Sequence, residues 1–343
     1  MHFVPTHHEH RETMSTNSNS TIGVAFIGGG LVAELHGRAV KACRNARLVG
    51  VHDLNAAKAR ATAKKFKGRA YTSQKELLED PAVDVVHVLT PPEAHVQATQ
   101  AALDAGMHVL VEKPVAHKAK DIKTIIRKAK SSGRLCVPAH NYIHVPSLRE
   151  AKRHITEGKF GKISAFWMLY NMFHGKNLIA KYGSIYRVVC VHHAYSLLYL
   201  LGRPLRVVSM GMRGVHAQNL PEVGQASITC EMPDGALANL WASFACDDPT
   251  SDPWQVVYKV LGTKGGMSYS WNEAHYEDEG GPGFGMPGYV DSFRFEVDHF
   301  INGCVLNGEP PLSTMDDALD ALRIIEAAER ASKGRKAVEV AYD

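Results

Sequence analysis

Short apolar runs separated by amphipathic stretches dominate the first 140 residues of the chain. Nearly continuous apolar runs are typical of strands that are buried on both faces, as in a parallel sheet. They occur at 21–27, 47–52, 83–89, 108–111 and 135–138. Stretches with small or apolar residues on one helical face follow residue 30 and cover 56–66, 94–105 and 119–132. This alternation predicts a doubly wound parallel sheet, a Rossmann domain over residues 21–140.

The pattern changes after residue 160, where strands follow one another without long helices between them. Strand patterns cover 163–169, 226–232, 236–243, 254–261 and 267–271. Pro233-Asp234-Gly235 and the glycine-containing stretch 262–266 predict two hairpin turns. Residues 141–343 are therefore predicted to form a second domain with a large, mostly antiparallel open sheet. Helices over 293–300 and 318–332 are expected to return to the first domain.

Composition narrows the class of protein. The 343 residues are 45% hydrophobic and 22% charged, with a net charge of +4 and no long basic block, so neither nucleic acid nor a membrane surface is expected as a partner. The six cysteines are scattered without a C-x-x-C pair, which favours reduced thiols in a cytoplasmic protein. Residues 1–20 are polar and histidine-rich and are expected to be a disordered tail.

A glycine-rich turn joins the first predicted strand to the first predicted helix. Residues 28–33 read Gly-Gly-Gly-Leu-Val-Ala and fit G-x-G-x-x-A. The motif lies between a predicted strand and a predicted helix, which is the context expected of a dinucleotide-binding turn. The first glycine permits a tight turn, the second lets backbone approach a pyrophosphate, and the helix start offers free N–H groups. The predicted cofactor contacts are Gly28, Gly30, Leu31, Val32 and Ala33.

Asp53 closes the second predicted strand, 23 residues after Gly30. A carboxylate at this point of a Rossmann domain is expected to bind the adenosine ribose hydroxyls, and an ordinary turn aspartate before the helix of 56–66 is the alternative. It repels a 2′-phosphate, and no arginine follows directly, so NAD is expected in preference to NADP.

Glu112, Lys113 and Pro114 end the central apolar strand abruptly. Ligands of open parallel sheets bind beyond the carboxyl ends of the strands, so Glu112 and Lys113 stand where a ligand would lie. A solvated ion pair at a strand end is the alternative.

Together these motifs resemble the Gfo/Idh/MocA family of NAD(P)-dependent oxidoreductases. The resemblance rests on the glycine turn, Asp53, the sequence Thr90-Pro91-x-x-x-His95 and Glu112-Lys113-Pro114, in this order. It implies that Lys113 lies at the nicotinamide and touches the substrate. The further cofactor contacts that we expect are Thr90, Pro91, His95, Glu112, Lys113 and Asn141.

His192 is the candidate acid/base. The segment Val188-Val189-Cys190-Val191-His192 corresponds to the family's D-x-G-x-H, with valine in place of the aspartate. A carboxylate would orient the histidine ring and stabilise its cation. Without one, we expect Lys113 to take a larger share of the proton transfer and His192 mainly to hydrogen-bond the substrate. Lys113, Tyr186, Tyr195 and His193 are open as compensating residues.

The substrate pocket is expected to suit a neutral ligand, because Tyr142 and Ile143 stand where the family usually has basic residues. The candidate substrate contacts are Lys113, Tyr142, Tyr186, His192 and His193, although His193 aligns with Leu197 and Leu200 and favours packing. His140-x-x-x-His144 has helical ligand spacing, but Pro138 and Pro146 disfavour a helix, and no metal is expected.

The predicted function is NAD-dependent oxidation of a secondary hydroxyl of a sugar, polyol or related carbohydrate. One alternative is a lyase or glycoside-cleaving enzyme that holds NAD tightly and oxidises its substrate transiently. Another is a non-catalytic nucleotide sensor. The apolar sheet surface near Trp241, Phe244 and Trp254 predicts a homodimer or homotetramer.

Overall fold

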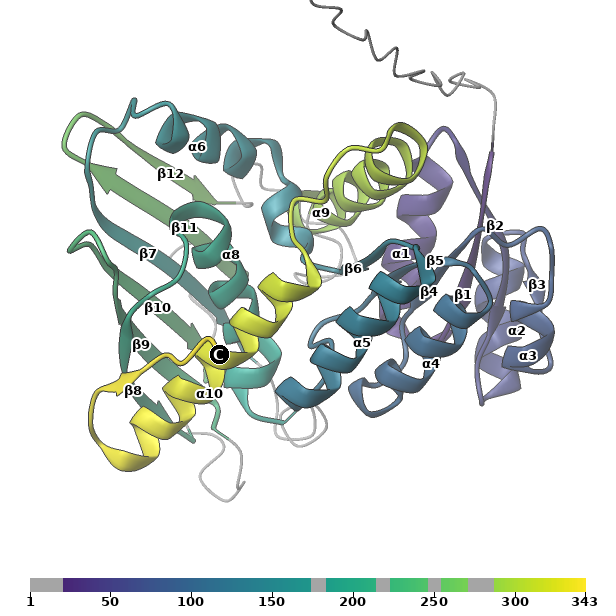
Figure 1. Cartoon of the computed structure of the whole chain (residues 1–343), viewed down its shortest axis with the longest axis horizontal. Helices are drawn as coiled ribbons and strands as arrows, with labels where there is room; N and C mark the ends of the chain where they lie inside the picture. The colour runs from purple at the N-terminus through teal and green to yellow at the C-terminus, as the bar shows by residue number, and fades with distance from the viewer. Residues whose placement is uncertain (1–20, 174–182, 214–222, 246–253, 271–286) are drawn as a thin grey trace, which may run out of the picture.

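The computed structural model describes residues 21–173, 183–213, 223–245, 254–270 and 287–343 (Figure 1). The predicted disordered tail lies outside these residues. The first part is a six-stranded parallel sheet in the order β3-β2-β1-β4-β5-β6, as predicted for a doubly wound fold. Its strands are β1 (Ile22–Ile27), β2 (Ala46–His52), β3 (Arg69–Ala70), β4 (Val85–Val88), β5 (His108–Val111) and β6 (Cys136–Pro138).

Helices cover both faces of this sheet. They are α1 (Leu31–Ala42), α2 (Ala56–Lys65), α3 (Gln74–Leu78), α4 (Pro92–Asp104) and α5 (Ala119–Ser132). One apolar core includes α1 and α2, and the other includes α4 and α5. Gly37 lets α1 pack closely, because a Cβ there would lie 2.3 Å from the Phe66 ring. The sequence pattern did not predict β3 and α3, which are too short to show a period.

A 3-10 helix, η1 (Asn141–His144), connects the first sheet to α6 (Pro146–Thr156). Pro138 and Pro146 were expected to disfavour a helix that carries His140 and His144, and the structure has only this 3-10 turn, which begins after His140. One short turn fits between them, and Pro146 starts α6, where a missing N–H costs nothing.

The second sheet has seven strands in the order β12-β11-β7-β10-β9-β8-β13. Its strands are β7 (Ile163–Met172), β8 (Arg206–Met212), β9 (Gln225–Glu231), β10 (Leu237–Ser243), β11 (Trp254–Gly262), β12 (Gly266–Ser270) and β13 (Val338–Glu339). The predicted hairpins β9–β10 and β11–β12 are confirmed. The sheet is mostly antiparallel as predicted, although β7 and β10 pair in parallel.

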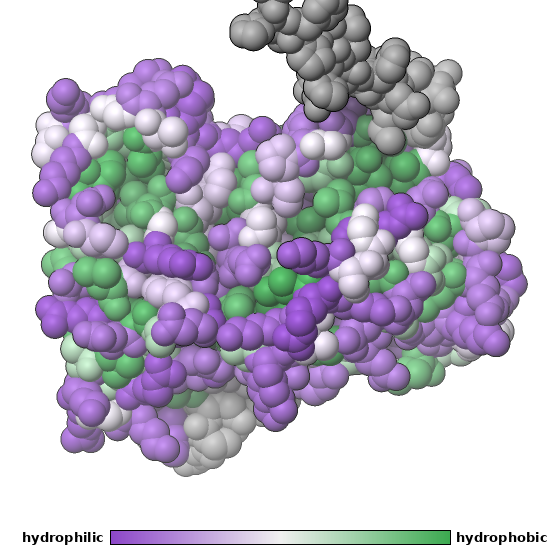
Figure 2. All heavy atoms as spheres, in the orientation of Figure 1, coloured by the Kyte–Doolittle hydropathy of each residue, from purple (hydrophilic) through white to green (hydrophobic). Residues whose placement is uncertain are grey.

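The other helical segments of the described residues belong to the second part of the chain. They are the π-helical turn η2 (Tyr186–Cys190), α8 (Val191–Leu201), α9 (Pro287–Asp298), the π-helical η3 (His299–Leu306) and α10 (Met315–Gly334). The helix α8 packs on the second sheet and contacts α10, α9 packs on α1, and α10 also contacts α5. Figure 2 shows a largely hydrophilic surface along α5 and α10. No helix in the described part of the chain is long and apolar enough to cross a membrane.

Candidate active site

The glycine turn has the geometry that a pyrophosphate requires. Gly28 adopts φ +110°, and a Cβ there would lie 2.6 Å from the Leu89 backbone. Gly30 caps α1 without any side-chain hydrogen bond, and a Cβ on Gly30 would meet no atom within 4 Å. Leu31 is exposed, while Val32 is partly buried and Ala33 fully buried. The start of α1 is therefore open to an anion, and these residues fit a dinucleotide.

Asp53 is tied to this turn. Its Oδ2 accepts the Gly29 N–H at 2.8 Å and its Oδ1 accepts the Asn55 N–H at 2.7 Å. The carboxylate therefore stands beside the predicted phosphate site, with both oxygens oriented by backbone donors. Its contact with a ribose hydroxyl stays a prediction.

Thr90 and Pro91 lie beyond the end of β4, beside the start of α4. The Thr90 Oγ1 is buried and has no hydrogen-bond partner among the residues that the structure describes, which fits a group that completes its bonding with a ligand. His95 is 1% exposed, and its ring nitrogens lie 2.7 Å from the Thr90 carbonyl and 3.0 Å from the Pro114 carbonyl. Its contacts tie this loop to the Lys113–Pro114 loop, and its direct contact with a cofactor stays a prediction.

Glu112 belongs to a buried network that sequence reasoning missed. His36 Nε2 lies 3.1 Å from Glu112 Oε1, and His36 Nδ1 lies 3.2 Å from His87 Nδ1. The Lys113 N–H donates to Glu112 Oε2 at 3.0 Å. Burial alone would raise the pKa of Glu112, but the His36 hydrogen bond and nearby charges hold it below its usual range. The sequence signal that could have revealed this network was His87, a polar residue inside the apolar run of β4.

Lys113 reaches from the end of β5 to the helical segment of the second part. Its Nζ donates to the Val188 carbonyl at 3.4 Å, one helical turn before His192. Burial lowers the pKa of Lys113 below its usual range, and the Glu112 carboxylate opposes that shift. Of the alternatives raised by the sequence, the solvated ion pair does not fit this position.

His192 is buried, 5% exposed, and has a partner other than a carboxylate. Its Nδ1 lies 2.5 Å from the Tyr195 hydroxyl. The Tyr142 ring stacks on the imidazole with centroids 4.1 Å apart. Burial, together with the positive charge of Lys113, lowers the pKa of His192 well below its ordinary value. The ring is therefore neutral at neutral pH, as a proton acceptor must be.

Asn141 stands next to this pair. Its Oδ1 accepts from the Tyr195 hydroxyl at 3.4 Å and its Nδ2 donates to Ser292 Oγ at 2.8 Å. Glu296, one turn further along α9, is 1% exposed, and its carboxyl oxygens have no hydrogen-bond partner among the described residues. Burial, and next the Glu112 charge, raise the pKa of Glu296 well above its usual value. Sequence reasoning missed Ser292 and Glu296, because α9 also carries Asp291, Arg294 and Asp298, so a polar residue in this helix gives no signal of its own.

Of the candidate substrate residues, Tyr186 has another hydrogen-bond partner and His193 is packed in the protein interior. The Tyr186 hydroxyl lies 2.6 Å from Ser209 Oγ on β8. His193 is 0% exposed with neither ring nitrogen hydrogen-bonded among the described residues, and burial lowers its pKa to about 3. Tyr186 is therefore bonded to the second sheet and His193 lies in the protein interior. Contact of either residue with a substrate stays a prediction.

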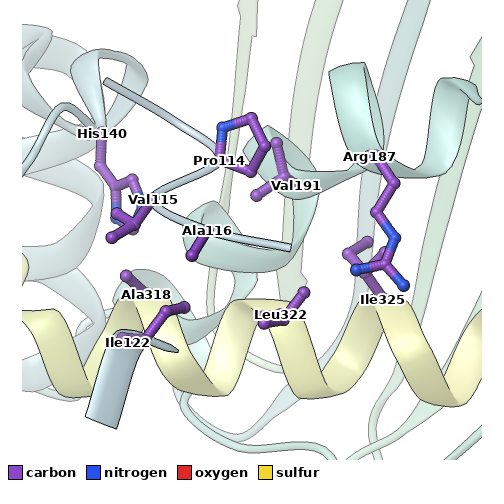
Figure 3. A pocket seen from close by; sticks show the side chains of 10 residues that line it. All are labelled: Pro114, Val115, Ala116, Ile122, His140, Arg187, Val191, Ala318, Leu322 and Ile325. Carbon is purple, nitrogen blue, oxygen red and sulfur yellow. The ribbon is translucent and has the colours of Figure 1, made fainter. Parts of the chain in front are cut away.

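A small cavity lies behind the Lys113–Pro114 loop (Figure 3). Pro114, Val115 and His140 line it, together with Leu322 and Ile325 of α10. Its volume of about 10 Å³ has room for roughly one water molecule, so it is not the place of a sugar-sized substrate.

No cluster of three or more metal-ligating side chains is found within the described ranges. His140 Nδ1 lies 2.7 Å from Ser313 Oγ, and the His144 ring lies 5.4 Å from that of His299. His140 and His144 therefore have different neighbours, Ser313 for the first and His299 for the second.

Two family sequence profiles match the chain. Residues 22–140 match the oxidoreductase family with an NAD-binding Rossmann fold, Gfo/Idh/MocA, and residues 152–340 match the C-terminal alpha/beta domain of the same family. The chain belongs to the Gfo/Idh/MocA family of oxidoreductases. The expected family, the two-part fold and an oxidoreductase acting on CH–OH groups are confirmed.

Relatives of this Gfo/Idh/MocA chain differ in cofactor. It is 27% identical over 323 residues to the NAD(+)-dependent scyllo-inositol 2-dehydrogenase of Bacillus subtilis (strain 168), covering 89% of this chain and 92% of that protein. It is 34% identical over 98 residues to the NADP(+)-dependent scyllo-inositol 2-dehydrogenase IolW of the same strain, covering 29% and 27%. Levoglucosan dehydrogenase, solved with NADH and levoglucosan, superposes with a TM-score of 0.81 at 19% identity, covering 94% and 100%.

Proposed function

We propose that this protein is an NAD-dependent dehydrogenase that oxidises a secondary hydroxyl of a sugar, a polyol or a related carbohydrate. The observation that carries the proposal is the convergence of Lys113 and His192 from two separate parts of the chain. The Lys113 amine contacts the backbone one helical turn before His192, and Lys113 ends a strand of the same sheet whose first strand leads into the open glycine turn. The names of the inositol and levoglucosan dehydrogenase relatives support the substrate class.

In this reaction the hydroxyl carbon loses hydride and the hydroxyl oxygen loses a proton, which leaves a ketone. Bound NAD would accept the hydride. The Lys113 amine polarises the reacting oxygen, and His192 takes the proton because its ring is neutral. The expectation that Lys113 takes over the proton transfer assumed that His192 has no partner. The Tyr195 hydroxyl at 2.5 Å provides one, so we assign the base to His192.

The test is a panel of neutral sugars and polyols with NAD, read by NADH absorbance and by product analysis. Net NADH formed together with a ketone supports the dehydrogenase. Substrate turnover without net NADH would instead indicate a lyase or glycoside-cleaving enzyme with transient oxidation. Cofactor binding without turnover of any compound would indicate a sensor.

We expect the protein to bind NAD(H) at least about tenfold more tightly than NADP(H), because the Asp53 carboxylate would meet a 2′-phosphate with like charge. Asp53→Ala should weaken NADH binding and relax the preference. Asp53→Asn is the matched variant, since it removes the charge while it keeps an oxygen acceptor for the Gly29 N–H. Dissociation constants from fluorescence titration provide the measurement, and equal affinity of the natural protein for both cofactors would contradict the assignment.

We propose that the outer face of the second sheet joins two copies of the chain. Val208, Met210 and Met212 of β8 are 53%, 69% and 61% exposed, and Trp167 of β7 and Leu237 of β10 are 40% and 50% exposed on the same sheet. The strand register places these side chains on one face of the sheet, with Thr229, Asn239 and Glu231 between them. Several exposed large apolar side chains on one face are unusual for a monomer. Of the aromatic residues expected here, Trp241 is half-buried, Phe244 is buried on the inner side, and the Trp254 side chain lies outside the described residues.

Light scattering at micromolar concentration should therefore give at least twice the chain mass. Met210→Asp should shift the mass toward the monomer, because a charge in an apolar interface is costly. Leu54→Asp is the control, since Leu54 is 99% exposed on the first part of the chain and lies outside this face. A monomer mass for the natural protein would rule out the dimer.

We also propose a cytoplasmic location, which the five free cysteines within the described residues support.

A further inference from the structure

We propose that Ser292, Asn141 and Tyr195 form a directional hydrogen-bond relay that holds the proton of His192 on Nδ1 and leaves Nε2 as the base. The relay would do the work of the aspartate that Val188 replaces. It deepens the proposed function, on which it rests for the role of His192 as a base. The position of the proton can nevertheless be measured without any turnover.

The direction of the relay is set at Ser292. Its hydroxyl donates to the Tyr289 carbonyl at 2.6 Å, and a carbonyl can only accept. The Ser292 oxygen is then an acceptor for Asn141, whose amide nitrogen lies 2.8 Å away. The Asn141 amide is therefore oriented, and its oxygen faces Tyr195 at 3.4 Å.

Tyr195 passes this direction on to His192. Its hydroxyl has one proton, which goes to the oriented Asn141 oxygen. The Tyr195 oxygen accepts the Tyr142 backbone N–H at 3.3 Å, a donor that cannot reverse. What this oxygen can still offer to His192 Nδ1, 2.5 Å away, is a lone pair. His192 must then carry its proton on Nδ1.

The consequence is a histidine that is poised to accept a proton. With the proton on Nδ1, the free Nε2 can take the substrate proton, and Tyr195 remains an acceptor for Nδ1 in the resulting cation. If Tyr195 donated instead, His192 would carry its proton on Nε2 and could not act as a base there. A neutral relay stabilises the cation less than a carboxylate, in agreement with the lowered pKa of His192.

Burial and ring stacking preserve the arrangement. Ser292, Asn141, Tyr195 and His192 are all at most 5% exposed, so bulk water does not compete for their hydrogen bonds. The Tyr195 ring stacks on His140 with centroids 4.0 Å apart, and the His192 ring stacks on Tyr142 at 4.1 Å. These contacts restrict both rings to one orientation.

The direct test is nitrogen NMR of the natural protein with ¹⁵N-labelled histidine at neutral pH. The His192 signals are assigned by difference from His192→Gln. We expect a proton-bearing Nδ1 and an unprotonated Nε2. Tyr195→Phe and Ser292→Ala should lose this preference, because the first removes the acceptor and the second frees the Asn141 amide to turn. A proton on Nε2 in the natural protein would overturn the relay.

Kinetics supply the second test. A histidine held in the wrong tautomer costs up to about 10⁴-fold in hydrolases that use an aspartate–histidine pair. We expect Tyr195→Phe to lower kcat about 10²-fold and Ser292→Ala about tenfold, with the KM for NAD nearly unchanged. Tyr199→Phe is the matched control, because Tyr199 lies one turn further along α8 and its ring faces Lys152.

Rescue separates orientation of His192 from general support of the fold. Adding Val188→Asp to Tyr195→Phe should recover at least about tenfold in kcat, because a carboxylate one turn before His192 can accept the Nδ1 proton. Loss of kcat without rescue, or an equal loss in Tyr199→Phe, would reject the relay. If no sugar or polyol is turned over at all, the proposed function fails, while the NMR measurement still decides the relay.

Discussion

Replacing Lys113 with methionine is expected to lower kcat by about 10²–10⁴-fold while NADH still binds. Methionine keeps most of the volume of the side chain but loses the charge and the hydrogen-bond donor that would polarise the substrate oxygen. The Lys113 amine lies within 3.4 Å of the Val188 carbonyl at the start of the helical segment that carries His192. A group in this position acts on the reacting atoms, so the loss should appear in kcat more than in the KM for NAD.

The matched control is Lys152→Met. Lys152 also donates to a backbone carbonyl at 3.4 Å, that of Leu200, and burial also lowers its pKa, but it extends from α6 away from the glycine turn. We expect its kcat to stay within about twofold of the natural value. Retention of more than a tenth of kcat in Lys113→Met would remove Lys113 from the active site.

His192→Gln should be about as inactive as Lys113→Met if His192 is the base. The sequence alone favoured a different division of roles, in which Lys113 takes a larger share of the proton transfer. In that case the loss of kcat on replacing His192 is distinctly smaller than the loss on replacing Lys113. Measurement of kcat for both variants, with NADH binding as the control for folding, separates the two divisions. A much more active His192 variant would restore the lysine as base.

The second large effect is a loss of stability on mild acidification. Within the described ranges, six histidines are at most 5% exposed and have pKa values lowered chiefly by burial: His87, His95, His140, His144, His192 and His193. Their pKa in the unfolded chain is near 6.5, so below that pH the unfolded state binds protons that the folded state does not. The free energy of unfolding must therefore fall as the pH falls.

The magnitude follows from linkage. His140 and His193, whose pKa values are lowered to about 3, each remove about 1 kcal/mol between pH 7 and 5.5. The other four histidines act in the same direction, and Glu296 acts in the opposite direction because burial raises its pKa in the folded state. The loss of about 2 kcal/mol from His140 and His193 alone is a substantial part of an ordinary free energy of unfolding of about 5–15 kcal/mol.

Urea unfolding of the natural protein at pH 8, 7, 6 and 5.5 measures this dependence. We expect little change between pH 8 and 7 and a steep fall below pH 6.5. In His193→Phe the slope of the free energy of unfolding against pH should decrease by the contribution of about one proton. The reason is that the His193 ring has no hydrogen-bond partner among the described residues and its pKa is lowered to about 3. A free energy that stays level down to pH 5.5 would show that these rings titrate normally.

The local pattern of apolar and polar residues was sufficient to predict the first part of the fold. Apolar runs and helical faces predicted the parallel sheet of residues 22–138, because both periods repeat over several residues. The glycine turn, Asp53 and Glu112-Lys113-Pro114 were recognisable because each chemistry needs particular residue types at a short spacing. The short β3 and α3 were not predicted, since two or five residues carry no period.

Contacts between distant residues were decided by the tertiary structure. Val188 and His192 are four residues apart in the chain and could be compared with a family pattern, but Ser292 lies 100 residues beyond His192. Its bond to Asn141 exists because α9 packs against η1, and no spacing within the sequence encodes that contact. The same holds for the His36–Glu112 bond, which joins residues 76 positions apart.

By itself, the sequence therefore determined the two-part fold, the family and the residues with chemical potential. The tertiary structure decided which of them meet. It brought Lys113 from the end of β5 to the segment before His192, gave His192 the Tyr195 hydroxyl as its partner, and directed Tyr186 to Ser209 and His193 into the protein interior. The physical reason is that a hydrogen-bond partner depends on distance and direction in space, whereas periodicity and motif spacing report only the local course of the backbone.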